Sequence, residues 1–482
     1  IHGVTGSGKT EVYMSLCDYY LKQDKTVLFL VPEISLTPQM VEYFLHRFED
    51  KIAVLHSGLT PAEKYDEYRR IARGEANIVV GARSAIFAPL KNIGLIILDE
   101  EHVESYKQDN VPTYHAREVA FMRARVNNSM VVLGSATPLL ETRIRAMKNI
   151  YNHVILPERI NKQPLPKTTI VDMLKGYNLC RESHMFSKLL YDKIKDRLEK
   201  HEQIILLINR RGFSTSVVCR ECGQAIKCPT CGISLTYHRN DNMLKCHHCG
   251  FVMQYPRTCP NCDSKYLSRT GFGTERIEEE ISKLFPKARV LRLDSDVGRV
   301  RNNISRVIEK FRKQEADILI GTQMIAKGHD FPNVTLVGVV SADIGLSLPS
   351  YRSTERVFQL ITQAVGRAGR KEKEGRALIQ TFNPNHYAVK CAANQDYDTF
   401  YRNEMNYRKN MAYPPYRYLS TITFQFANKD KLYKYVCEVK EKIYELFNDP
   451  SLVVLGPSEP HISFHDGKYR YRLILKYKNF IK

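Results

Sequence analysis

Short apolar runs rich in strand-forming residues recur through the first third of the chain, with amphipathic helical stretches such as residues 61–73 between them. Runs of this kind are typical of parallel strands that are buried on both faces. Strands that alternate with helices predict a doubly wound α/β domain, in which ligands bind at the carboxyl ends of the strands. The four runs are residues 26–31, 78–81, 95–98 and 130–133.

The same alternation resumes in the middle of the chain and predicts a second α/β core. Residues 186–200 have the spacing of an amphipathic helix, and residues 203–209 form another apolar run. Residues 290–293 and 318–320 add two further strands. Residues 161–178 contain scattered prolines and little periodicity, so we expect them to connect the two lobes.

The end of the chain predicts a small α+β module. A basic, helical stretch at 387–413 runs into a Pro-Pro breaker, and strands at 419–426 and 468–478 flank a helix at 430–447. The last strand alternates cations with apolar residues, so it predicts a half-buried strand whose basic face suits a nucleic-acid backbone or a partner protein. A merely solvated basic face fits the pattern equally well. The basic face carries Lys468, Arg470, Arg472, Lys476 and Lys478, and the apolar face carries Tyr469, Tyr471, Leu473, Leu475 and Tyr477.

A segment at the start of the chain fits the phosphate-loop pattern, in which a glycine and four residues precede Gly-Lys-Thr. Glycines allow backbone N–H groups to curl around a triphosphate. We expect Lys9 to reach the β- and γ-phosphates and the Thr10 hydroxyl to ligate Mg²⁺. An ordinary turn is the alternative, but the complete pattern running into a helical stretch argues against it. The nucleotide-binding segment is Gly3, Val4, Thr5, Gly6, Ser7, Gly8, Lys9 and Thr10.

An acidic cluster directly follows the third apolar run. A carboxylate at a strand end beside a phosphate loop can hold Mg²⁺ through water, and we expect Asp99 to do so. Glu100 is the candidate for orienting the attacking water. Glu101 and His102 complete the cluster, and a Ser-Ala-Thr segment follows the next apolar run.

Eight of the twelve cysteines form four Cys-x-x-Cys pairs. Four pairs supply the ligands of two tetrahedral zinc sites, although spacing alone does not tell which pairs share an ion. Four bound thiolates give each site a net charge of about −2, which nearby Arg220, Lys227, Lys245 and Arg257 would offset. His247 and His248 are expected at the surface. The ligands are Cys219, Cys222, Cys228, Cys231, Cys246, Cys249, Cys259 and Cys262.

The overall charge of the chain points to a polyanionic partner. The 482 residues carry a formal net charge of +20, with 72 Lys+Arg against 52 Asp+Glu. Nucleic acid is the commonest partner of such a protein, although a merely basic protein would look the same. The length suggests two to four domains. No apolar stretch approaches the roughly 20 residues needed to span a bilayer.

The phosphate loop, the Asp-Glu-Glu-His box and the Ser-Ala-Thr tripeptide, in this order, resemble those of superfamily 2 helicases. GVTGSGKTEVY (3–13), VPEISLTPQ (31–39), HSG (56–58) and GARSAIFAPL (81–90) closely resemble the family of bacterial primosomal replication-restart helicases. The resemblance implies an ATP-driven 3′→5′ DNA helicase that uses ATP, Mg²⁺ and two Zn²⁺. It also implies forked and single-stranded DNA, primosome proteins and single-stranded DNA-binding protein as partners, in the bacterial cytoplasm at the nucleoid.

The resemblance extends to residues with implied roles. Residues 105–118 resemble a loop that senses single-stranded DNA, in which Tyr106 and Tyr114 would stack on bases while Lys107, His115 and Arg117 meet phosphates. Two packed tyrosines in an ordinary loop are nearly as plausible. Residues 321–330 resemble a motif that links nucleotide to DNA, and residues 363–370 an arginine-finger motif. The residues concerned are Thr322, Gln323 and Lys327 in the first motif and Arg367 and Arg370 in the second.

The resemblance also implies a division of the chain and of its zinc ligands. The first and fourth cysteine pairs would share one ion and the two inner pairs the other. We expect a first lobe at 1–158, a linker and the start of the second lobe at 159–213, a zinc-binding insert at 214–265, the rest of the second lobe at 266–410 and a C-terminal domain at 411–482.

Family members carry an N-terminal DNA-binding region, and they continue beyond the last strand. We therefore expect the chain to be a fragment that lacks the N-terminal DNA-binding region and part of the C-terminal domain. Another superfamily 2 translocase is one alternative, and a zinc-bearing primosome scaffold with little motor activity is the other.

Overall fold

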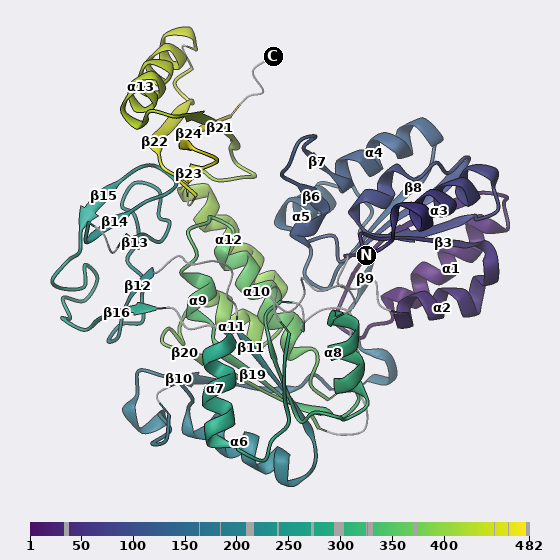
Figure 1. Cartoon of the computed structure of the whole chain (residues 1–482), viewed down its shortest axis with the longest axis horizontal. Helices are drawn as coiled ribbons and strands as arrows, with labels where there is room; N and C mark the ends of the chain where they lie inside the picture. Colours follow the sequence, from purple (N-terminus) through teal and green to yellow (C-terminus); the bar gives the residue numbers. More distant parts are fainter. Residues whose placement is uncertain are drawn as a thin grey trace.

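The computed structural model of the chain describes residues 1–32, 38–162, 164–183, 185–208, 216–238, 241–270, 274–293, 303–323, 325, 331–369, 374–447, 449–460 and 462–478. Figure 1 shows two lobes side by side, each built around a parallel sheet, with the cysteine-rich insert beside the second lobe and the C-terminal module next to the insert. The predicted architecture of two α/β lobes, a zinc-binding insert and a small α+β module is confirmed.

The first lobe is built on a five-stranded parallel sheet. One apolar cluster packs on each face, against α1 and α2 on one side and α3 and α4 on the other. Both faces are covered, which explains why the strands read as continuous apolar runs. In spatial order the strands are β3 (Ile52–Leu55), β4 (Ile78–Gly81), β2 (Thr26–Leu30), β5 (Ile93–Asp99) and β8 (Met130–Gly134), and the helices are α1 (Lys9–Leu21), α2 (Pro38–Phe48), α3 (Pro61–Arg73), α4 (Ala116–Asn127) and α5 (Leu140–Met147).

The second lobe has a six-stranded parallel sheet, covered by α6 and α7 on one face and by α8, α10 and α11 on the other. The segment expected to connect the lobes contains the edge strand β10 of this sheet, which pairs with β20. In spatial order the strands are β10 (Lys167–Asp172), β20 (Arg376–Thr381), β19 (Val334–Ser341), β11 (Gln203–Ile208), β18 (Ile318–Gly321) and β17 (Val290–Leu293), and the helices are α6 (Lys188–Glu199), α7 (Thr274–Leu284), α8 (Asn303–Arg312), α9 (Asp343–Leu346), α10 (Ser353–Val365), α11 (Tyr387–Ala393) and α12 (Tyr397–Asn410).

Two smaller antiparallel sheets complete the fold. The insert, together with the strand that directly follows it, contains β15 (Val252–Gln254), β14 (Met243–Lys245), β13 (Thr236–His238), β12 (Ser216–Cys219) and β16 (Leu267–Thr270), in that spatial order. The C-terminal module packs α13 (Lys429–Leu446) on a sheet in which β24 lies between β21 and β22 and also pairs with β23. Its strands are β21 (Tyr418–Phe426), β22 (Val453–Ser458), β23 (Phe464–His465) and β24 (Lys468–Tyr477).

The two lobes meet through buried charged groups. The backbone N–H of Leu140, in the first lobe, donates to Glu355 Oε1 at 3.2 Å, in the second. The fully buried Arg408 of α12 pairs with Glu355 at 2.6 Å and with Glu404 at 3.0 Å. Because buried charges are costly unless they are paired, this cluster fixes how α5, α10 and α12 pack together.

Candidate functional site

The phosphate loop lies between a two-residue strand and α1. That strand, β1 (His2–Gly3), pairs in parallel with β9 (Ile155–Leu156), and α1 begins at Lys9. Gly6 and Gly8 have φ values of +84° and +83°, a conformation that glycine adopts without strain. A Cβ on Gly3 would lie 2.4 Å from Ser7 Oγ, so the loop curls back on itself more closely than a side chain at that position would allow.

The chemistry of this loop fits a bound triphosphate. The Lys9 ammonium donates to the carbonyl of Gly3 at 2.9 Å, so it lies inside the curl of the loop. The buried Ser7 hydroxyl has no hydrogen-bond partner among the residues that the structure describes. Thr10 is the second residue of α1, directly after Lys9. A loop with an inward ammonium and an unsatisfied hydroxyl matches the donors that phosphate oxygens require.

Asp99, the last residue of β5, faces the phosphate loop and is held by two tyrosines. Tyr13 of α1 donates to Asp99 Oδ1 at 3.0 Å, and Tyr106 donates to the Asp99 carbonyl at 2.7 Å. Burial raises the pKa of Asp99 to about 6, the charge of Glu100 adds to the rise, and the Lys9 ammonium opposes it. A carboxylate destabilised in this way gains from a cation beside it, as expected of a Mg²⁺ ligand.

Tyr13 reaches Asp99 only because residue 134 is a glycine. A Cβ on Gly134 would lie 1.6 Å from the Tyr13 hydroxyl, a distance at which the two atoms would overlap. Sequence reasoning assigned no role to Tyr13, which ends the 3–13 segment, or to Gly134, which precedes the Ser-Ala-Thr segment. Their role depends on a contact between α1 and β8, which no local pattern records.

The remaining residues of the acidic cluster contact the second lobe or the Ser-Ala-Thr segment. Gln363 of α10 donates to Glu100 Oε2 at 3.2 Å and hydrogen-bonds with His102 Nε2 at 3.1 Å. His102 Nδ1 in turn lies 2.8 Å from Ser135 Oγ. Glu101 is buried and accepts from the Leu139 N–H at 2.8 Å. The candidate water-orienting carboxylate is therefore positioned by both lobes.

The arginine-finger motif lies against the phosphate loop. A Cβ on Gly366 would lie 2.8 Å from Thr5 Cβ, so the two segments touch. Arg159 donates to the Gly366 carbonyl at 3.2 Å and ties the contact to the segment after β9. Arg367 is 7% exposed at this junction. Arg370 lies outside the described residues.

The loop expected to sense DNA forms a short hairpin, β6 (Lys107–Gln108) with β7 (Tyr114–His115), and α4 follows it. Tyr106 is completely buried, and its hydroxyl is shared between the carbonyls of Asp99 and Leu30. The prediction that Tyr106 stacks on a base is therefore wrong, because its ring is part of the core of the first lobe.

The other loop residues differ in how far they are available to DNA. Lys107 is exposed and pairs with Asp109 at 3.0 Å. Tyr114 is half-buried, with its ring against Phe87 and the Arg83 guanidinium. His115 caps α4 by accepting from the Arg117 N–H, and burial lowers its pKa to about 4. Arg117 lies 3.6 Å from Glu101, so its charge is directed into the first lobe.

Two of the three candidates after β18 fall in the described part of the chain. Thr322 and Gln323 are half-buried at the carboxyl end of that strand. Lys327 lies outside the described residues. The role expected of all three stays a prediction.

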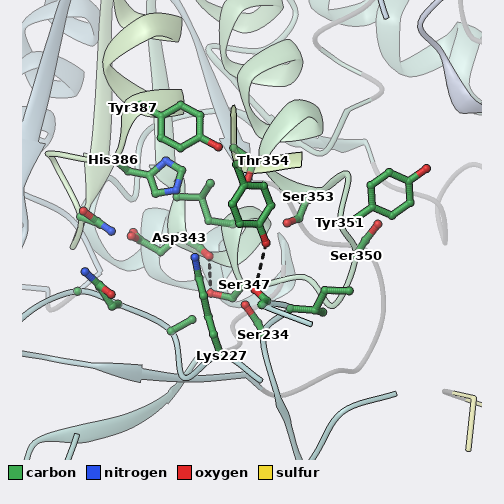
Figure 2. Close-up of a pocket in the computed structure, with 18 of the residues that line it drawn as sticks. Lys227, Ser234, Asp343, Ser347, Ser350, Tyr351, Ser353, Thr354, His386 and Tyr387 are labelled. Atoms are coloured by element: carbon green, nitrogen blue, oxygen red, sulfur yellow. Dashed lines mark hydrogen bonds between the residues drawn. The ribbon is translucent and has the colours of Figure 1, made fainter. Parts of the chain in front are cut away.

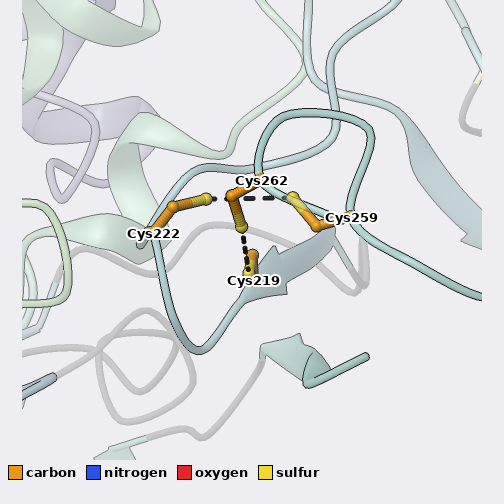
Figure 3. A group of neighbouring side chains, drawn as sticks. All are labelled: Cys219, Cys222, Cys259 and Cys262. Atoms are coloured by element: carbon orange, nitrogen blue, oxygen red, sulfur yellow. Dashed lines mark hydrogen bonds between the residues drawn. The ribbon is translucent and has the colours of Figure 1, made fainter. Parts of the chain in front are cut away.

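The eight cysteines form two separate clusters. Cys219, Cys222, Cys259 and Cys262 converge as Figure 3 shows, and Cys228, Cys231, Cys246 and Cys249 form the other. Sulfur–sulfur distances of 3.6 and 3.8 Å in the first cluster and of 3.4 Å in the second approach the edge of a ZnS₄ tetrahedron, about 3.8 Å for Zn–S bonds of about 2.3 Å. The clusters supply two zinc sites, in the nested arrangement that the family resemblance implied. We call the first the outer cluster and the second the inner cluster.

Two of the glycines that follow cysteine pairs pack closely against other parts of the chain. A Cβ on Gly223 would lie 1.8 Å from the carbonyl oxygen of Phe382, in the second lobe. At Gly250 it would lie 2.5 Å from the carbonyl oxygen of Pro457, in the C-terminal module. The outer cluster thus abuts the second lobe, and the inner cluster abuts the C-terminal module.

The C-terminal strand β24 approaches the inner cluster with its basic face. Lys476 is buried, donates to the Met411 carbonyl at 3.0 Å and lies over the Tyr413 ring. Burial lowers the pKa of Lys476, and the thiols of Cys231 and Cys249 oppose that shift. Arg472 donates to the His247 carbonyl. This part of the basic face therefore packs on the insert and is not open to nucleic acid.

One expectation about side chains around the zinc sites is wrong, and another stays a prediction. His247 and His248 are buried at the junction with the C-terminal module, where His247 Nδ1 lies 2.8 Å from the Glu459 carbonyl oxygen. Their polar neighbours in the sequence gave no sign of this junction. Of the cations expected to offset the thiolates, Lys245 pairs with Asp241 and Arg220 stacks over the Phe382 ring, and their effect on the thiolate charge stays a prediction.

The site and the fold define a class. A phosphate loop and an acidic strand end from one parallel-sheet lobe meet a Gln-x-x-Gly-Arg segment from a second such lobe, which is the arrangement of a two-lobed helicase fold. Four family profiles match successive parts of the chain. They are described as DEAD/DEAH box helicase (1–144), PriA DNA helicase Cys-rich region domain (228–253), Helicase conserved C-terminal domain (267–372) and Primosomal protein N C-terminal domain (409–481).

Curated relatives called replication restart protein PriA match nearly the whole chain. The protein of Bacillus subtilis (strain 168) is 48% identical, over 99% of this chain and 59% of the relative. That of Synechocystis is 43% identical, over 100% and 59%. That of Treponema pallidum is 40% identical, over 100% and 72%. The chain therefore belongs to the family of replication restart protein PriA. It spans about three fifths of the length of the first two relatives, at 59% of each.

Proposed function

We propose that the chain is the motor of an ATP-dependent 3′→5′ DNA helicase that acts in replication restart at stalled forks. The observation that carries the proposal is the pair of hydrogen bonds from Gln363, in the second lobe, to Glu100 and His102, in the first. They make the geometry of the hydrolytic carboxylate depend on how the lobes are placed. An ATPase with this dependence can convert hydrolysis into relative motion of two lobes along a strand.

Each residue of the site has a role in this proposal. Lys9 holds the β- and γ-phosphates, and Thr10 and Asp99 hold Mg²⁺, which neutralises the phosphate charge when bound. Glu100 orients the attacking water. Arg367 and Arg370 stabilise charge that develops on the γ-phosphate when the lobes close. The contact between Gly366 and Thr5 supports the assignment of Arg367, because it brings that segment to the phosphate loop.

We propose that coupling to DNA runs through the 105–118 loop by displacement of Tyr106. Its hydroxyl bonds the carbonyl of Asp99, while the hairpin that begins at Lys107 reaches the surface. A strand that binds the hairpin would pull on the main chain beside the Mg²⁺ ligand. Lys107 and Tyr114 are the candidates for direct DNA contact, and Thr322, Gln323 and Lys327 for contact from the second lobe.

Partners, location and domain limits belong to the same proposal. Forked and single-stranded DNA are the substrates, and primosome proteins and single-stranded DNA-binding protein the partners, in the bacterial cytoplasm near the nucleoid. The motor comprises residues 1–158 and 159–410 around an insert at 214–265, with a C-terminal domain from 411. Among the described residues, no helix is both long enough and apolar enough to cross a membrane.

The test is an ATPase assay on the full chain with forked DNA, single-stranded DNA or RNA. DNA should stimulate hydrolysis more than RNA does. Gln363→Ala should lower the DNA-stimulated rate at least tenfold and leave nucleotide binding intact, whereas Gln254→Ala, on an exposed strand of the insert, should change neither. Equal stimulation by RNA, or a Gln363→Ala rate equal to that of Gln254→Ala, would contradict the proposal.

A further inference from the structure

A polar cavity of about 420 Å³ lies between the zinc-binding insert and the second lobe. The insert contributes the turns at 223–227 and 232–234, and the second lobe contributes residues from α9 to the start of α10, the 383–387 loop and Tyr407 (Figure 2). The volume is within the range of small-molecule sites. The residues that line the cavity include no zinc ligand, no part of the phosphate loop and no part of the DNA-sensing loop.

Two serines in the wall of this cavity are buried as residues, but their hydroxyl oxygens are open to the cavity and lack protein partners among the described residues. Ser234 is 4% exposed and Ser353 is 8% exposed, and neither hydroxyl has a hydrogen-bond partner in the described ranges. Neighbouring serines differ, because Ser347 Oγ donates to the Asp343 carbonyl at 2.7 Å and Ser350 Oγ accepts from the Arg352 N–H at 3.2 Å. Both hydroxyls are therefore free to donate a hydrogen bond to a ligand in the cavity.

The same cavity contains the ammonium of Lys227, which the charge of Glu404 attracts although Glu404 itself is held by Arg408 and Tyr387. Lys227 points into it beside Ser347 and Asp343 (Figure 2), and no carboxylate of the described residues lies within ion-pair distance of its Nζ. Asp343 is engaged elsewhere, since its carboxylate accepts from Thr381 Oγ1 at 2.8 Å and from the Phe382 N–H at 3.0 Å. The positive charge in the cavity therefore remains available to a ligand.

The start of helix α10 adds to the positive electrostatic potential in the cavity. Helix α10 has thirteen residues and begins at Ser353 in the cavity wall, and its N-cap residue Arg352 forms no side-chain cap. Its first N–H groups carry the positive end of the helix dipole. His386 caps α11 by accepting from the Ala388 N–H, and burial lowers its pKa to about 4, so its ring is neutral and available as a neutral donor.

We propose that this cavity binds a phosphate group, either of a free phosphorylated compound or of a nucleic-acid strand passing between the insert and the second lobe. An ammonium, two free hydroxyls and a helix start converge on it, and a phosphate has oxygen acceptors enough for all of them. The amide side chains of Asn383 and Asn385 and the ring of Tyr407 give the rest of the ligand polar and aromatic contacts. The site is separate from the phosphate loop and does not depend on hydrolysis.

The test removes phosphate binding at the first lobe and measures what remains. The full chain with zinc bound carries Lys9→Ala as background, and binding of inorganic phosphate and of a single-stranded oligonucleotide is followed by calorimetry. Lys227→Met should weaken phosphate binding at least tenfold, and Ser234→Ala several-fold. Lys265→Met is the matched control, because Lys265 is an exposed lysine of the same insert that does not line the cavity.

Inorganic phosphate and the oligonucleotide distinguish a free phosphorylated compound from a nucleic-acid strand as the source of the phosphate group. Loss of inorganic phosphate binding identifies a site for free phosphorylated compounds, and loss confined to the oligonucleotide identifies a strand phosphate. Zinc content and melting temperature are measured for every variant. If Lys227→Met loses zinc, the test rests on the phosphate affinity of Ser234→Ala, because that substitution removes only one oxygen. The proposal would be overturned if the background protein bound neither ligand, or if the cavity variants bound both ligands as Lys265→Met does.

Discussion

Replacing Tyr106 with Phe tests how the DNA-sensing loop reaches the ATP site. The substitution keeps the buried ring and removes the hydroxyl that the carbonyls of Asp99 and Leu30 share, at 2.7 and 3.0 Å. Loss of a buried hydrogen bond costs about 1–3 kcal/mol. A shift of about 1 Å at a catalytic group can cost roughly a hundredfold in rate. We therefore expect the hydrolysis rate to fall about 10- to 100-fold while nucleotide affinity stays nearly unchanged.

The choice of Phe separates the role of the hydroxyl from that of the ring. A ring that acts only through packing would work as well in Tyr106→Phe as in the parent protein, so an unchanged rate would mean that the hydroxyl does not link the loop to the ATP site. Tyr114→Phe is the matched control from the same loop, and its rate should stay at that of the parent. The assay measures kcat and KM with and without single-stranded DNA. A rate for Tyr106→Phe within twofold of that for Tyr114→Phe would refute the reasoning.

Three further predictions follow from other contacts. Gly366→Ala should lower kcat at least tenfold by pushing the arginine motif off Thr5, whereas Gly176→Ala, which meets no atom within 4 Å, should not. Lys476→Met should loosen the contact between the insert and the C-terminal module and so speed chymotrypsin cleavage of the chain, whereas Lys478→Met should leave the cleavage rate unchanged. Elemental analysis should find two zinc ions per chain in both variants. Burial raises the pKa of Asp343 to about 6, so its contribution to stability is complete below about pH 4 and is lost as the pH rises through about 6. Calorimetry should accordingly find Asp343→Asn stabilising relative to the parent by about 1 kcal/mol more at about pH 7.5 than at about pH 5.5.

The sequence predicted the central strands of the first lobe, which are buried on both faces, but it missed the equally buried strands β19 and β20 of the second lobe. The four apolar runs of the first third correspond to β2, β4, β5 and β8, because central parallel strands cannot avoid being apolar. The edge strand β10 escaped notice, since it alternates exposed and half-buried residues and includes two threonines beside a proline. An edge strand buries fewer positions, so its composition resembles that of a loop.

The candidate site was predictable where a motif fixes the local backbone. The glycines of the phosphate loop, the acidic end of β5 and the cysteine pairs all have roles that follow from spacing. Tyr13, Gly134 and Gln363 were missed as individual residues, because their roles come from contacts between α1 and β8 or between the two lobes. Tyr106 shows the opposite failure, in which a tyrosine in a polar loop belongs to the core.

The position of β24 changes what the net charge of +20 means. Alternation of cations along a strand identifies a basic face but not the anion that the face meets. Lys476 and Arg472 meet the inner cluster and its neighbourhood, where thiolates with a bound zinc carry about −2 and burial strengthens the attraction. A cation that is paired with an anion inside the protein is not available to bind DNA. The cations to test for DNA binding are therefore exposed ones such as Lys107, whose surface pair with Asp109 is weak enough to yield to a phosphate.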